Sequence, residues 1–166
     1  MEPLELPANF EYFERKDAAI AEKLIQEQGE DICRHIISKH YISIHSRDYD
    51  FGIIHKTPMA QTGRMTRKRT SQQYAYSFVL CKVHAELGDV DITLICSRPN
   101  SRDGKVLMKL VEDISRLKEC KTMSLLSIGD TKVLNWYRHQ GFILKSEKHY
   151  PDGNLKAYSM YKVIGT

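Results

Sequence analysis

The sequence predicts a mixed α/β fold. Two runs rich in β-branched and aromatic residues, at 74–84 and 89–97, are typical of long strands. An amphipathic helix is predicted at 103–118, and strand, helix and strand patterns alternate from there to the end. The chain has 166 residues, of which 42% are hydrophobic, so we expect a single domain over residues 1–166.

The first half carries weaker signals. The run "NFEYFER" is typical of a short strand, and Asp17 is a candidate cap for a helix over "AAIAEKLIQEQ". Gly29 interrupts the pattern, and "EDICRHIISKHYI" predicts a second helix. The stretch "FGIIH" is either a short strand or part of the loop that follows it.

The second half is clearer. The turn "AELG" joins the two long strands into a hairpin, and the helix at 103–118 follows at once. The run "TMSLLSI" predicts another strand. Asp130 is a candidate cap for a short helix over "TKVLNWYRHQ", which Gly141 ends. The remaining residues predict a terminal hairpin around "PDGN".

Composition points to an intracellular protein without metal. No apolar run approaches the length of a membrane span, and the start, "MEPLELPANF", lacks a hydrophobic signal core. We therefore expect a soluble cytoplasmic or nuclear protein. The four cysteines, Cys33, Cys81, Cys96 and Cys120, include no close pair, so reduced thiols are expected, without zinc or disulfides.

The net charge of +4 is concentrated in one stretch. Residues 56–85 contain six Lys or Arg and no acidic residue, and "KTPMAQTGRMTRKRTSQQ" lacks apolar periodicity. A long exposed loop is expected there. It either binds nucleic acid or another anion through residues 56–72, or only keeps the protein soluble.

The run "RPNSRDGKVLMKL", together with "NWYRHQGF", resembles the GNAT (Gcn5-related N-acetyltransferase) family from about Tyr74 to the end. Pro99 ends a strand, and Arg102 matches the first position of that family's acetyl-CoA signature. Lys105 and Leu107 stand where the signature has glycine or alanine. The resemblance implies a mostly antiparallel sheet with two splayed strands, and acetyl-CoA as cosubstrate without a metal.

The resemblance also implies where acetyl-CoA would bind. Backbone N–H groups of the splayed strand would bind the carbonyl and the pantetheine chain, and the turn with the helix start would bind the pyrophosphate. The cofactor residues implied are Leu94, Ile95, Cys96, Ser97, Arg102, Asp103, Gly104, Lys105, Val106, Leu107 and Asp130. Leu107 would either crowd the cofactor or join the hydrophobic face of the helix.

Acetyl transfer to an amine needs a base for the amine proton and an acid for the leaving thiolate. The resemblance implies Tyr137 as the acid and Asp91 as the base, with Asp89 and His84 as alternatives to Asp91. The expected function is an acetyl-CoA-dependent N-acetyltransferase acting on a primary amine of a protein or a small molecule. The alternatives are an inactive acyl-CoA-binding or regulatory module and a nucleic-acid-binding protein. The acceptor and the oligomeric state are not predicted.

Overall fold

The fold is built on one seven-stranded sheet. The computed structural model describes residues 4–15, 48–58, 74–97, 101–128, 131–150 and 155–165. The sheet has the strand order β1-β2-β3-β4-β5-β7-β6, and among these strands only β4 and β5 pair in parallel. The predicted mixed, mostly antiparallel sheet is confirmed.

The strands alternate with two helices in the order the sequence predicts. The elements are β1 (Phe10–Glu14), β2 (Phe51–Pro58), β3 (Tyr74–His84), a 3₁₀ turn η2 (Ala85–Leu87), β4 (Asp89–Cys96), α3 (Asp103–Leu117), β5 (Thr122–Ile128), α4 (Thr131–His139), β6 (Ile143–Tyr150) and β7 (Leu155–Val163). The early helices predicted after Asp17 and after Gly29 lie outside the described residues.

The ambiguous stretch "FGIIH" is a strand. β2 includes it and continues through Lys56 to Pro58, so the predicted loop at 56–73 begins too early. These last three residues pair with Tyr74, Ala75 and Tyr76 of β3. Their strand conformation comes from this cross-strand pairing, which local sequence patterns do not show. The rest of the basic loop lies outside the described residues.

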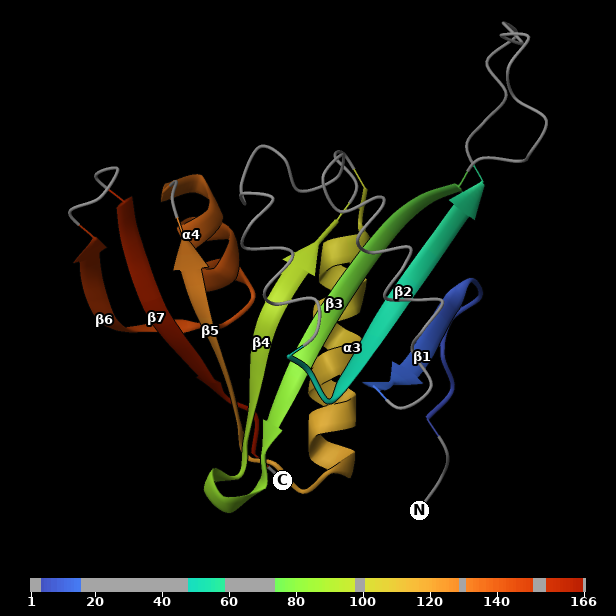
Figure 1. Cartoon of the computed structure of the whole chain (residues 1–166), viewed down its shortest axis with the longest axis horizontal. Coiled ribbons are helices and arrows are strands. Elements are labelled where there is room, and N and C mark those ends of the chain that lie inside the picture. Colours follow the sequence, from blue (N-terminus) through green and yellow to red (C-terminus); the bar gives the residue numbers. More distant parts are fainter. Residues whose placement is uncertain are drawn as a thin grey trace, which may run out of the picture.

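Both described helices lie on one face of the sheet, behind it in Figure 1. Leu107, Val111 and Ile114 of α3 are buried, and they share one core with Leu134 and Tyr137 of α4 and with side chains from the sheet. Gly141 ends α4 with φ +96°, a conformation that favours glycine, as predicted.

The cysteines differ from the expectation in one place. Cys96 is disulfide-bonded, so the prediction of a reduced thiol is wrong for this residue. Disulfide pairing depends on which cysteines the fold brings together, and sequence spacing does not reveal that. Cys81 and Cys120 are free and buried, whereas Cys33 lies outside the described residues.

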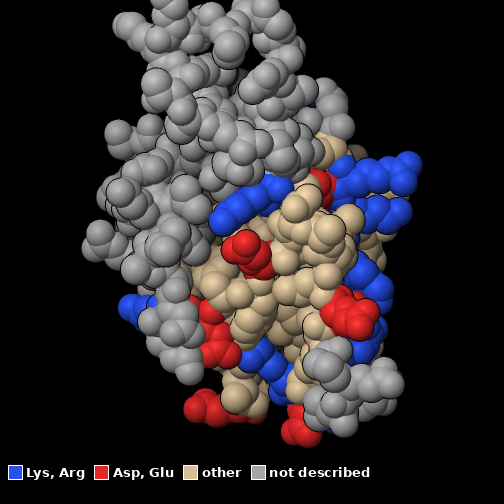
Figure 2. Space-filling model, turned by 90° about the vertical axis from the view of Figure 1, so that its right-hand side faces the viewer, with Lys and Arg blue, Asp and Glu red and all other residues tan. Residues whose placement is uncertain are grey.

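Charges of both signs are mixed on the side of the molecule seen in Figure 2. Its described part shows uncharged surface with acidic and basic side chains beside it, and no large area of one sign. This part of the surface therefore gives no support to a nucleic-acid interface, which requires clustered cations.

Candidate active site

The centre of the candidate site is the place where β4 and β5 separate. The two strands pair only from Asp89 with Thr122 to Ile92 with Leu125. Beyond these residues β4 stays paired with β3, and β5 stays paired with β7. The two halves of the sheet diverge above this point, as Figure 1 shows. The predicted splay is confirmed.

A bulge in β4 lies at the point of separation. Leu80 of β3 pairs with Leu94 and the next residue, Cys81, pairs with Ile92, so Thr93 is an extra residue in β4. The Thr93 hydroxyl donates a hydrogen bond of 3.1 Å to the Leu80 carbonyl. A bulge increases strand twist and changes strand direction, so the bulge helps to turn β4 away from β5.

Leu94, Ile95 and Cys96 follow the bulge on the open part of β4, and Ser97 comes directly after the strand. The side chains of Leu94 and Cys96 are buried, and Ile95 packs against the main core. Successive backbone N–H groups of a strand point to opposite sides, so some of those at 94–97 point into the gap. Any contact that Leu94, Ile95 or Cys96 makes with a ligand in the gap therefore comes mainly from the backbone.

The first turn of α3 begins just beyond the end of β4. Arg102 caps the helix through its backbone, and its side chain and that of Lys105 are exposed. Within the described part of the chain, the backbone N–H groups of Gly104 and Lys105 donate no hydrogen bond, and Arg102 and Lys105 form no ion pair. This turn therefore offers two N–H groups, two cations and the positive end of the helix dipole to an anion.

Asp103 is held below the turn. Its side chain belongs to a residue only 7% exposed, and its Oδ2 accepts a hydrogen bond of 2.7 Å from Ser77 Oγ and lies 3.0 Å from His55 Nδ1. Its carboxylate therefore fixes the start of α3 to β2 and β3, and its predicted contact with the cofactor stays a prediction. His55 and Ser77 are not among the residues that the sequence predicts for the site. Both lie on strands, opposite each other in register, and only the sheet pairing brings them together.

Gly104 serves packing as well as backbone access. A Cβ atom at this position would lie 3.2 Å from Ser97 Oγ and 3.2 Å from Trp136 Cζ2. The Trp136 ring on α4 therefore lies against the first turn of α3, and glycine permits that approach. Trp136 is not among the predicted site residues. The chain has a single tryptophan, and its position next to the predicted residue Tyr137 could have indicated that it belongs to the site.

Leu107 belongs to the core. It is fully buried in the cluster between the sheet and the helices. Of the two alternatives for this side chain, the structure therefore shows the one in which it joins the hydrophobic face of the helix, and a contact of the Leu107 backbone with the cofactor stays a prediction. Val106 is half-buried and packs against the same core.

Tyr137 lies on α4 beside Trp136. It is 8% exposed, and its ring meets those of Trp136 and Phe142 edge to face, with centroid distances of 5.2 Å and 6.1 Å. Because Trp136 contacts Gly104, this part of α4 lies next to the first turn of α3. The structure thus brings the aromatic pair of α4 and the candidate phosphate turn together.

Asp91 and Asp89 lie at the closed end of the splay. Ser124 Oγ donates a hydrogen bond of 2.6 Å to Asp89 and a longer one, 3.4 Å, to Asp91. Val90 and Ile92 face the core that contains Tyr137, so the intervening Asp91 points to the other face of the sheet. The structure does not place Asp91 and Tyr137 side by side, and a base at Asp91 would need water to reach the site.

Three further points concern Asp130, metal ligands and membrane-spanning helices. Asp130 lies outside the described residues, so its predicted cap and cofactor roles stay predictions. No group of three metal-ligating side chains occurs in the described part of the chain. Neither described helix has the length and apolar character that crossing a bilayer requires.

Comparison with known proteins finds similar proteins by structure only. No family model matches the sequence, and no curated protein does. A Desulfovibrio desulfuricans protein described as a GNAT-family acetyltransferase superposes with a TM-score of 0.65 at 12% identity, over 94% of this chain and 99% of that one. The ribosomal-protein-S18-alanine N-acetyltransferase of Escherichia coli gives 0.59 at 15% identity, over 95% of both chains.

A third similar structure is an aminoglycoside 6′-N-acetyltransferase complexed with coenzyme A, with a TM-score of 0.63 at 8% identity, over 95% of this chain and 97% of that one. These likenesses extend over almost the whole chain, well beyond the region in which the sequence resembles the family. At such low identity they establish the fold and leave the activity to be tested. The resemblance found in the sequence is confirmed at this level, and the chain has the fold of the GNAT family.

Proposed function

We propose that this chain is an acetyl-CoA-dependent N-acetyltransferase that transfers the acetyl group to a primary amine by direct attack. The observation that carries the proposal is the separation of β4 from β5 directly beside a helix start with two exposed cations, Arg102 and Lys105. The open edge of β4 would bind the thioester end of acetyl-CoA, and the cationic turn would bind its phosphates. The complex of a similar fold with coenzyme A supports the same ligand.

In this proposal the turn binds phosphate oxygens through the N–H groups of Gly104 and Lys105. The side chains of Arg102 and Lys105 add charge-assisted contacts. The degenerate signature does not block this role, because Lys105 keeps its backbone N–H and Leu107 has turned into the core. The open edge at 94–97 would hydrogen-bond the pantetheine chain and the thioester carbonyl.

The reaction forms a C–N bond and breaks the C–S bond of the thioester. Polarisation of the carbonyl by backbone N–H groups stabilises the charge that develops on its oxygen. We assign Tyr137 as the proton donor to the departing thiolate. Asp91 would take the amine proton through water, because it points to the other face of the sheet. The acceptor is a protein amine or a small-molecule amine.

The first test is binding. Acetyl-CoA at a hundredfold excess over its Kd stabilises a native protein by about 2.7 kcal/mol, so we expect the melting temperature to rise by about 5–10 °C. Lys105→Glu should abolish most of this shift. Lys121→Glu is the matched control, because Lys121 is also exposed and lies beyond the other end of α3.

The second test is turnover, measured as release of free CoA thiol over a panel of amines and peptides. Tyr137→Phe should lower kcat roughly 10²-fold while the acetyl-CoA shift is kept, because only proton transfer is removed. Binding without turnover for every acceptor would favour the regulatory module instead. The absence of both the thermal shift and turnover would refute the proposed function.

A further inference from the structure

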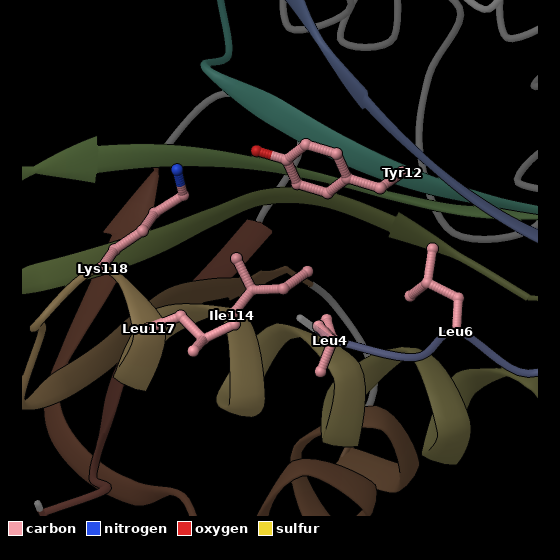
Figure 3. A pocket seen from close by; sticks show the side chains of 6 residues that line it. All are labelled: Leu4, Leu6, Tyr12, Ile114, Leu117 and Lys118. Carbon is pink, nitrogen blue, oxygen red and sulfur yellow. The ribbon is translucent and has the colours of Figure 1, made fainter. Parts of the chain in front are cut away.

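A pocket of about 370 Å³ lies at the end of α3 farthest from the candidate active site. Figure 3 shows the residues that line it, which come from the N-terminal segment, β1 and the end of α3: Leu4, Leu6, Tyr12, Ile114, Leu117 and Lys118. α3 has 15 residues, so the pocket is about 20 Å along the helix from the first turn. It is separate from the gap between β4 and β5.

The walls of the pocket are mostly hydrocarbon. Leu4, Leu6, Ile114 and Leu117 approach one another across it, and the Tyr12 ring lies along one side (Figure 3). Ile114 is buried, Leu4 and Leu6 are half-buried, and Leu117 is exposed at the rim. A ligand that fills this space must therefore present an apolar body.

One end of the pocket carries a single cation. The Lys118 ammonium lies 5.3 Å from the centre of the Phe51 ring, which is a cation–π contact. In the described part of the chain, Lys118 has no ion pair with a carboxylate. The Lys118 stem lines the pocket, and in Figure 3 its ammonium stands at the end opposite Leu6.

The Tyr12 hydroxyl already has a hydrogen-bond acceptor within the protein. It donates a hydrogen bond of 3.3 Å to Glu14 Oε1, so its proton is not available to a ligand. Lys118 is therefore the cationic donor that the pocket offers. A ligand fits best when its negative group lies at Lys118 and its body extends toward Leu6.

From this arrangement we propose that the pocket binds a medium-chain monocarboxylate, an unbranched acid of roughly eight to ten carbons. A dry cavity of about 150 Å³ already accommodates benzene, and small-ligand pockets begin near 300 Å³, so a chain of this size fits the volume. The carboxylate would lie at the rim, next to Lys118 and water, and the chain would lie among the leucines.

The experiment measures dissociation constants of hexanoate, octanoate and decanoate by titration calorimetry, below their micelle concentrations. Each methylene that enters the pocket should tighten Kd about fourfold, which corresponds to about 0.8 kcal/mol. Decanoate should bind about fivefold more tightly than decanol, because only the acid can pair with Lys118. Lys118→Met keeps most of the apolar stem and should remove this preference, leaving decanol binding unchanged.

A control variant and a variant with a filled pocket test whether decanoate binds in this pocket. Tyr12→Phe is the matched control and should leave decanoate binding within twofold, because the lost hydroxyl faces Glu14. Leu117→Trp should fill the pocket and abolish binding. Leu4→Trp serves the same purpose if the first variant does not fold, as judged by its melting transition.

Several outcomes would overturn the proposal. These are no saturable binding of decanoate, a preference of Lys118→Met for decanoate over decanol as large as that of the wild type, or unchanged binding in a folded Trp variant. Displacement of decanoate by saturating CoA would also overturn it, since the ligand would then lie between β4 and β5. The pocket does not depend on the proposed enzymatic function, so failure of either proposal leaves the other standing.

Discussion

At the residue scale, Leu107 shows how a departure from a family signature can be structural. A glycine or alanine is the family's choice at this position, and the leucine here contributes a fully buried side chain to the core. Lys105, two residues earlier, replaces the other glycine and is exposed. The two departures from the signature therefore differ physically: Leu107 adds to the core, and Lys105 adds a charge at the surface.

We expect the substitution that restores the signature, Leu107→Gly, to lower the free energy of unfolding by about 3 to 6 kcal/mol. Loss of a buried leucine leaves a cavity, and glycine weakens the helix. Urea denaturation measures this change. Lys105→Gly is the control and should cost about 1 kcal/mol or less. A loss below 1 kcal/mol for Leu107→Gly would show that this side chain is not part of the core.

Tyr12 gives a pH dependence at the same scale. Burial, and secondarily the Glu14 carboxylate, raises the pKa of its phenol from 10.0 to about 12. Between these values the unfolded chain loses the proton and the folded chain keeps it. The free energy of unfolding should therefore fall as the pH rises from about 10 to about 12.

Denaturation at several pH values in this window, on wild type and Tyr12→Phe, checks the prediction. The fall with pH should be shallower in the variant, because it lacks the group with the raised pKa. Since the tyrosine is partly exposed, the difference should be modest. Parallel stability curves for the two proteins would contradict the assigned pKa.

At the element scale, α3 and α4 meet where the Trp136 ring lies on Gly104. This contact couples the candidate phosphate turn to the helix that carries Tyr137. Glycine at 104 costs helix stability relative to alanine, and the close approach of Trp136 is the structural reason to keep it. The two helices are thus packed directly against each other at this point.

A double-mutant cycle tests this coupling. Gly104→Ala should be neutral or destabilising in wild type, because its Cβ would crowd Trp136. In a Trp136→Phe background the same change should be more favourable by about 0.5 to 1.5 kcal/mol. Thermal denaturation of the four proteins gives the coupling free energy. Lys105→Ala with Trp136→Phe is the control cycle, and it should be additive.

At the scale of the whole molecule, the sheet consists of two halves. Strands β1 to β4 form one half and β5, β7 and β6 form the other, joined by the short ladder from Asp89 to Ile92. The gap therefore depends on the packing that holds the halves at their angle. α3 and α4 supply part of that packing from the shared core.

The reactivity of Cys81 can be used to test whether the sheet is intact. It is buried in β3, and burial together with the nearby Asp91 charge raises its thiol pKa well above the usual value. We expect its alkylation to require global unfolding and to follow the urea transition seen by circular dichroism. Cys120 lies in the connection between α3 and β5 and should react at lower urea.

Pulsed alkylation followed by peptide mass spectrometry measures both rates in one sample. Rapid alkylation of Cys81 in native buffer would mean that β3 opens locally, contrary to its central position between β2 and β4.

Local sequence patterns were sufficient to predict most of the described elements. Alternation predicted β3 and β4, and the apolar stripe at 103–118 predicted α3 because side chains repeat along one helix face. Gly141 predicted the end of α4. The first strand, β5 and the terminal hairpin were also predicted, and the family resemblance predicted the splay of β4 from β5.

The sequence by itself therefore determined the class of sheet and the order of the described elements apart from β2. Only the tertiary structure decided that Leu107 turns inward, that His55 and Ser77 hold Asp103, and that Asp91 and Tyr137 lie on opposite faces. It also revealed the pocket at Lys118. The physical reason is that periodicity is a property of neighbours in the chain. Contacts between distant residues depend on register, twist and helix rotation, which a single bulge or bulky side chain can change.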